Sequence, residues 1–197
     1  MVRPVNIHTH RCCTTETTIR TVGIHPYDAA KADEGLVAEV ELGAVEADAV
    51  GEIGLDFAVD ANRDTQRDLF ARQLTIAERL YKPIVLHCVR AFEPVMDMLR
   101  DARVPAVIFH GFIGSAKQAQ RAVERGYYLS FGERTLRSPK SIEALRSIPL
   151  ARVFVETDDS PTPIEELYDR IAALLDISTE ELMLQTRENF EHIFGKR

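Results

Sequence analysis

Short apolar runs alternate with amphipathic segments along the chain, and this alternation limits the possible fold more than any other feature. The runs are rich in Val, Ile and Leu, for example at 83–87 and 152–156. The clearest amphipathic segment, 62–81, repeats its apolar residues at helical spacing. Strands that are apolar on both faces are typical of a parallel sheet covered by helices. The sequence therefore predicts an α/β protein with about seven core strands.

The expected elements are separated by Gly, Pro and polar residues, which end strands and helices. The expected strands lie at 5–10, 19–24, 49–54, 83–87, 106–110, 127–131 and 152–156. The expected helices lie at 28–41, 62–81, 91–101, 116–125, 141–147, 164–175 and 179–194. We find no internal repeat and no second domain, so residues 1–197 are expected to form a single domain.

Polar groups that can bind metal recur at the ends of these strands. His8 and His10 are two residues apart in an extended segment, so both side chains can face one ion. Similar groups end or follow the later strands, namely His25, Glu52, His87, His110 and Asp158. Groups from the first, middle and last strands converge only if the sheet closes, and no G-x-G-x-x-G loop indicates an open nucleotide-binding sheet. We therefore expect a TIM-barrel-like fold.

Charge and apolar content limit the compartment and the partners. The formal net charge of −7 gives no general attraction for nucleic acid, so a polyanion would need a local patch or a metal ion. The N-terminus has no apolar signal core, and no run approaches the roughly 20 apolar residues of a membrane span. We expect a cytoplasmic protein with no membrane partner.

The three cysteines do not indicate a disulfide scaffold, because their number is odd and neighbouring cysteines rarely bridge each other. We interpret Cys12, Cys13 and Cys88 as free thiols of a reducing compartment. Soft metal ligation by Cys12 and Cys13 is the alternative, because both follow His10 closely.

Several segments together resemble a known family. They are Asn6–His10, Gly23–Pro26, Gly51–Asp56, Val85–Arg90, Phe109–Ser115, Glu156–Asp158 and Glu188–Phe190. In this order and at these intervals, the set resembles the TatD-related deoxyribonucleases, a branch of the metal-dependent hydrolase superfamily. The resemblance implies a TIM-barrel-like fold, one or two divalent metal ions, and hydrolysis of DNA or another phosphodiester.

The same resemblance implies a metal centre built from the groups at the strand ends. The ligands of one metal would be His8, His10, Glu52 and Asp158. The ligands of a second metal would be Glu52, His87 and His110, so Glu52 would bridge the two ions. Imidazole ligands favour Zn, Mn or Co, and the carboxylates also allow Mg.

The resemblance also implies catalytic and substrate-binding roles. Asp158 would take the proton of the attacking water and Glu52 would hold both ions, so these two residues are the expected catalytic groups. His25 and Arg90 are candidates for contacting a phosphate of the substrate. A turn is the alternative role for His25.

The chain departs from the family pattern in two places. Only residues 11–18 separate His10 from the next strand, so one β/α unit is expected to be missing after strand one. A gap or distortion of the barrel wall is expected there. Asn6 stands where the family usually has Asp, and it shares a face with His8 and His10. We therefore expect weaker metal binding than in relatives with Asp, and expect Asn6→Asp to tighten it.

Simpler explanations remain for several polar residues. Asp158 and Asp159 could cap a helix, and capping is the preferred role for Asp159. Glu156 is expected to be a structural or supporting partner of the site. A basic segment could touch nucleic acid, although a solvated loop is the commoner explanation for Arg134, Arg137 and Lys140.

The sequence leaves two alternatives to a phosphodiesterase. One is hydrolysis of another ester or an amide by the same kind of centre. The other is a catalytically weakened remnant that binds metal, which the shortened N-terminal region favours.

Overall fold

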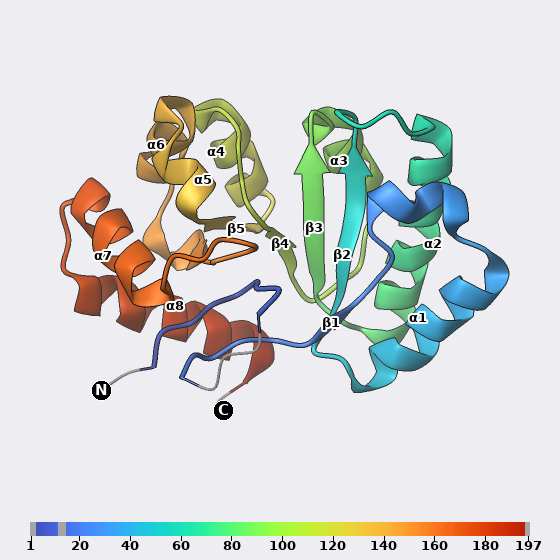
Figure 1. The fold of residues 1–197 in the computed structure, drawn as a ribbon, viewed down its shortest axis with the longest axis horizontal. Helices are drawn as coiled ribbons and strands as arrows, with labels where there is room; N and C mark the ends of the chain where they lie inside the picture. Colours follow the sequence, from blue (N-terminus) through green and yellow to red (C-terminus); the bar gives the residue numbers. More distant parts are fainter. Residues whose placement is uncertain (1–2, 12–14, 196–197) are drawn as a thin grey trace. The chain divides into compact units, whose positions relative to one another are not determined.

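The computed structural model describes residues 3–11 and 15–195, which form two compact units. One unit consists of the chain up to Thr18 together with the chain from His110 onwards, and the other is Ile19–Phe109. The course of the chain can be followed in Figure 1.

The Ile19–Phe109 unit is built on a parallel sheet. Its strands lie in chain order, as β1 (Thr21–Val22), β2 (Ala49–Asp56), β3 (Ile84–Val89) and β4 (Val107–Phe109). In Figure 1, β2 and β3 run side by side. Ile53, Leu55 and Leu86 have no exposed surface. Their burial confirms the expectation that these apolar runs form buried parallel strands.

Helices of this unit follow the strands, as η1 (Pro26–Lys31), α1 (Glu34–Glu46), α2 (Arg63–Leu80) and α3 (Phe92–Met98). The side chain of Asn62 caps α2 by accepting hydrogen bonds from two backbone N–H groups of its first turn. Two buried glutamines then fix α2 to the rest of the unit. Gln66 bonds both the N–H and the carbonyl of Asp56, and Gln73 does the same with Ile24. These contacts hold the main chain next to His25 and at the end of β2.

The other unit contains the paired parallel strands β5 (Tyr128–Phe131) and β6 (Val153–Val155). Its helices are α4 (Ala116–Glu124), α5 (Glu133–Leu136), α6 (Pro139–Arg146), η2 (Leu150–Arg152), α7 (Ile164–Leu175) and α8 (Thr179–Phe194). A capping box between Ser115 and Gln118 begins α4. The two closing helices, α7 and α8, have the bounds that the sequence predicts.

The N-terminal segment belongs to the unit that contains β5 and β6, and scattered hydrogen bonds connect it to that unit. Asn6 N–H donates to the carbonyl oxygen of Thr17 at 2.8 Å, and Ile7 N–H donates to that of Val155 at 3.1 Å. The buried Tyr168 hydroxyl donates to the carbonyl oxygen of Val5 at 2.8 Å. Residues 4–8 are thus buried, and the described part of the segment forms isolated bridges and no regular strand.

The strand expected at 5–10 is therefore wrong, because this segment pairs with its neighbours through single bridges and not through a continuous ladder of hydrogen bonds. The described residues contain six strands where about seven were expected. The helix expected at 28–41 is also wrong at its start, since Asp33 caps α1 and residues Pro26–Lys31 form a 3₁₀ helix. The four-residue helix α5 was not expected.

The expectation of a single domain over 1–197 stays a prediction. None of the helices in the described part of the chain combines the length and apolarity needed to cross a bilayer.

Candidate functional site

The loop after β6 is paired through its main chain with the His8–His10 segment. Asp158 N–H donates to the carbonyl oxygen of His8 at 3.1 Å, and His10 N–H donates to that of Asp158 at 3.2 Å. Asp158 has a φ of 53°, a left-handed conformation that Asp tolerates better than most residues. The main chain therefore sets the relative positions of these three side chains.

Their side chains gather around one carboxylate oxygen. Asp158 Oδ1 lies 3.7 Å from His8 Nε2 and 3.4 Å from His10 Nε2. One ligand atom from each of the three residues lies within 4.8 Å of the others. His8 is buried, whereas the His10 side chain is 57% exposed, so the cluster has a covered and an open side.

His110 and Glu156 extend this cluster inside the same unit. The ring centroids of His8 and His110 are 4.5 Å apart, and His110 Nδ1 lies 3.5 Å from Glu156 Oε1. Ser130 Oγ donates a hydrogen bond to Glu156, which is almost fully buried. Glu156 thus lies directly beside His110, and its expected supporting role stays a prediction.

The electrostatics of the two carboxylates differ. Burial raises the pKa of Asp158, and the neighbouring charge of Glu156 raises it further, although His110 and His8 act in the opposite direction. Burial also acts to raise the pKa of Glu156, but the hydrogen bond and charge of His110 outweigh it, so that pKa lies below its usual value. Glu156 is thus held as a carboxylate, while Asp158 is the more basic group.

A second cluster lies in the Ile19–Phe109 unit. Glu52 Oε2 lies 3.8 Å from His25 Nε2 and 3.7 Å from His87 Nδ1. Ligand atoms of these three residues lie within 4.8 Å of one another. His25 Nδ1 accepts a hydrogen bond from Tyr27 N–H and so caps η1. The turn role that was the alternative for His25 is therefore carried by Nδ1, while its contact with a phosphate stays a prediction.

Asp56 is a partner of this cluster that the sequence did not single out. Its Oδ2 lies 2.9 Å from His87 Nε2, and its Oδ1 accepts a hydrogen bond from Ala58 N–H at 2.7 Å. Burial acts to raise the pKa of Asp56, but the hydrogen bond from His87 and the other bonds outweigh it, so the pKa is lowered. The bond to Asp56 fixes the ring of His87 and leaves Nδ1 toward Glu52. The signal in the sequence was a carboxylate at the end of a buried strand.

Arg90 and Cys88 follow His87 at the end of β3. Arg90 is exposed and has a φ of 51°, and its contact with a phosphate stays a prediction. Cys88 is a free cysteine, and burial raises the pKa of its thiol to about 12, as expected of an inert thiol. Cys12 and Cys13 lie outside the described residues.

Asn6 has partners other than the histidines with which it shares a face. Its amide Nδ2 donates to Glu16 Oε2 at 2.6 Å and to Thr157 Oγ1 at 2.9 Å, and its Oδ1 accepts from Thr157 N–H at 3.0 Å. Asn6 therefore anchors the residue just before Asp158. An Asp at position 6 would place its carboxylate against that of Glu16, so the structure weakens the expectation that Asn6→Asp improves the site.

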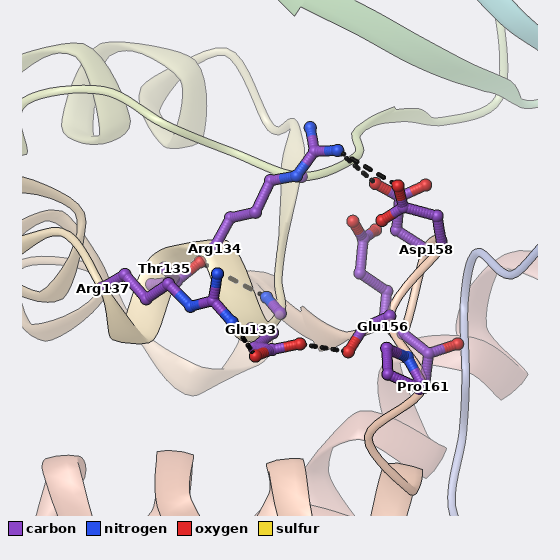
Figure 2. A pocket seen from close by; sticks show the side chains of 12 residues that line it. Glu133, Arg134, Thr135, Arg137, Glu156, Asp158 and Pro161 are labelled. Carbon is purple, nitrogen blue, oxygen red and sulfur yellow. Dashed lines mark hydrogen bonds and ion pairs between the residues drawn. The ribbon is translucent and has the colours of Figure 1, made fainter.

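A cavity of about 340 Å³ opens beside Asp158 (Figure 2). Its walls come from α5 and from the loop after β6, including Arg134, Asp158 and Asp159. Arg134 points toward Asp158 in Figure 2. Its Nη2 also lies 3.4 Å from Asp159 Oδ2. Asp159 does not cap α7, because Pro163 holds the N-cap position. The capping role preferred for Asp159 is therefore wrong.

The donor atoms in each cluster fit a divalent metal ion. Two imidazoles and one carboxylate are the ligand set of many catalytic zinc and iron sites, and they also suit manganese and cobalt. The His8–His10–Asp158 and His25–Glu52–His87 clusters each have this composition. The cluster of His110, Glu156 and Asp158 offers one imidazole and two carboxylates. Whether the six expected ligands share one centre stays a prediction, as does every individual ligand assignment.

Solved structures share this fold. A TatD homologue from Escherichia coli, YjjV, is 26% identical and has a TM-score of 0.83, with 94% of this chain and 79% of that chain covered. A TatD-family hydrolase from Entamoeba histolytica has a TM-score of 0.81 at 17% identity, with 93% and 77% covered. The fold is therefore the TIM-barrel-like α/β fold of these hydrolases.

The comparison of sequences gives the family. The family model described as TatD related DNase matches residues 7–195, and the chain belongs to this family. The uncharacterized metal-dependent hydrolase YabD of Bacillus subtilis is 32% identical, with 88% of this chain and 76% of that protein covered. The deoxyribonuclease TATDN3 of Homo sapiens is 29% identical, and the match covers 75% of this chain but only 60% of that protein. The matches thus span only part of the length of these relatives.

Proposed function

We propose that the protein is a metal-dependent hydrolase that cleaves phosphodiester bonds in DNA. The observation that carries the proposal is the His8–His10–Asp158 cluster, whose carboxylate also lines a cavity. The names of relatives support a nucleic-acid substrate, since they include a deoxyribonuclease and a 3'-5' ssDNA/RNA exonuclease from Citrobacter rodentium. The formal charge of −7 means that the polyanion must be held locally at this site.

His8, His10 and Asp158 would hold one divalent ion through the atoms that already face one another. A bound divalent ion supplies Lewis acidity, which activates water and neutralises the charge of a phosphodiester. Two main-chain hydrogen bonds between Asp158 and the His8–His10 segment hold the backbone of these residues in register before substrate arrives. Such fixed geometry matters because a misplacement of about 1 Å can cost about 100-fold in rate.

Asp158 would accept the proton of the attacking water. Its Oδ1 faces the histidines, so its Oδ2, on the side of Arg134, is the oxygen that receives the proton. His110 and Glu156 would hold the neighbouring ring and carboxylate in place.

Glu52, His25 and His87 would form the second group of functional residues. Asp56 fixes the His87 ring by its 2.9 Å contact with Nε2, and His87 Nδ1 would then be the ligand atom. The bridging role of Glu52 and the ligand role of His110 for a second ion follow from the family resemblance. Arg90 would contact a phosphate of the substrate.

A panel of substrates tests the proposal. Purified protein should be freed of metal, supplied in turn with Mn²⁺, Mg²⁺, Zn²⁺ and Co²⁺, and assayed on single-stranded DNA, duplex DNA, an aryl ester and an aryl amide. The proposal expects cleavage of DNA with at least one ion. Cleavage of the ester or amide alone would replace it with the other hydrolase class, and inactivity on all substrates despite bound metal would favour a remnant.

A further inference from the structure

We propose that Arg134 is a substrate-binding residue that contacts the phosphate of one nucleotide unit in the cavity beside Asp158. The proposal rests on the proposed function and adds a binding residue to it. Sequence reasoning favours a solvated loop for the basic segment that contains Arg134. The structure instead places this residue in the short helix α5, at the wall of the cavity (Figure 2).

The guanidinium of Arg134 is paired with carboxylates and still has N–H groups that can donate to an anion. Its Nη2 lies 3.4 Å from Asp159 Oδ2 and 3.9 Å from Asp158 Oδ2, while the side chain stays 61% exposed. An arginine has five N–H donors in a planar fork that matches the oxygens of a phosphate. Asp159 therefore positions the group, and donors remain that can face an anion in the cavity.

The two oxygens of Asp158 separate the metal side of the site from the arginine side. Oδ1 is the atom near His8 and His10, and Oδ2 is the atom near Arg134. A cation bound through Oδ1 would partly neutralise the negative charge of Asp158. The attraction between Asp158 and Arg134 would then be weaker. A phosphate beside Asp158 could then have one oxygen toward the metal ligands and another toward the guanidinium.

The neighbouring arginine, Arg137, is already paired with a carboxylate of the protein. Arg137 forms an ion pair with Glu133, and Glu133 also accepts hydrogen bonds from Ser160 and Thr162. This network connects α5 to the loop after β6. Of the two arginines, Arg134 is therefore better placed to donate hydrogen bonds to a phosphate. The cavity volume of about 340 Å³ lies at the lower end of ligand sites, which suits a single nucleotide unit.

Binding of a mononucleotide tests the role of Arg134 without any turnover. The probes are thymidine 5′-monophosphate and thymidine, titrated calorimetrically into the Mn²⁺-loaded protein. The wild type should bind the monophosphate at least about tenfold more tightly than the nucleoside. Arg134→Gln should remove about tenfold of the affinity for the monophosphate and leave the affinity for thymidine unchanged. Lys140→Gln is the matched control, because it removes the same charge from exposed Lys140, which does not line the cavity.

Three outcomes would overturn the proposal. They are equal losses in Arg134→Gln and Lys140→Gln, unchanged binding in Arg134→Gln, and a wild type that does not prefer the monophosphate. Failure of the proposed function looks different. If the protein prefers the monophosphate through Arg134 but cleaves no DNA, the phosphate subsite stands and the proposed nuclease function is wrong. If the protein cleaves DNA but Arg134→Gln binds the monophosphate as tightly as the wild type, the nuclease function stands and the subsite is wrong.

Discussion

The main-chain N–H of Asp158 donates to the carbonyl oxygen of His8 at 3.1 Å, so two residues far apart in the sequence share one hydrogen-bonded register. The facing of their side chains, with Oδ1 3.7 Å from Nε2, follows from this register. A change of the Asp158 side chain that preserves its shape should therefore alter the chemistry of the cluster without moving its main chain.

Glu52→Gln should lose far more nuclease activity than Asp159→Asn. Glu52 Oε2 lies between two imidazole nitrogens at 3.8 and 3.7 Å, whereas Asp159 contacts the exposed guanidinium of Arg134. Removing the charge of Glu52 should lower the rate by about 100-fold or more, and Asp159→Asn should lower it by less than about tenfold. The measurement is the initial rate on DNA with saturating metal. Similar losses in the two variants would show that these roles are misassigned.

Asn6→Asp should destabilise the protein. The new carboxylate would face Glu16 in place of the amide that donates to it at 2.6 Å, and the donor to Thr157 would also be lost. We expect a loss of about 1–3 kcal/mol in the free energy of unfolding, measured with urea. The double variant Asn6→Asp with Glu16→Gln should recover part of this loss, because the repulsion is removed. A single variant as stable as the wild type would refute this account of position 6.

Asp56 should make stability depend on pH in the acid range. Its pKa lies below the usual 3.8, so folding favours the ionised form. This contribution is fully present above the usual value and is lost as the pH falls through the lowered one. The stability difference between the wild type and Asp56→Asn, measured by urea unfolding, should therefore shrink as the pH falls below about 4. A difference that stays constant down to pH 2 would contradict the assignment.

Asp56→Asn should also weaken metal binding at neutral pH. The variant keeps an oxygen that can accept from His87 Nε2, but it loses the charge that orients and polarises the ring. Changes at such supporting residues typically lower metal affinity by about 10- to 100-fold. Titration of Mn²⁺ into metal-free wild type and variant measures the effect, with Asp60→Asn on the exposed loop after β2 as a control for charge. Equal affinities would mean that Asp56 only supports the fold.

The sequence predicted the elements with long, regular patterns and the residues at their ends. α7 and α8 have the expected bounds because their apolar residues recur at helical spacing over several turns. His87 was recognisable at the end of a continuous apolar run, and the structure places it in β3. Glu52 likewise lies inside β2.

Features that depend on a few tertiary hydrogen bonds could not be predicted from the sequence. The segment at 5–10 has the composition of a strand, but its pairing consists of isolated bridges. The contacts of Asn6 with Glu16 and of Arg134 with Asp159 depend on where loops lie, and no spacing rule gives that. The helix α5 has only four residues and is too short to show a period.

Cleavage of a labelled single-stranded DNA oligonucleotide by metal-free protein, before and after Mn²⁺ is restored, tests the central claim most directly. The account predicts no cleavage without metal, cleavage by the restored wild type, and a rate lower by about 100-fold or more in Asp158→Asn that has the same thermal stability. Cleavage that persists in excess EDTA, or equal rates for the wild type and Asp158→Asn, would contradict a metal-dependent hydrolase centred on the His8–His10–Asp158 cluster.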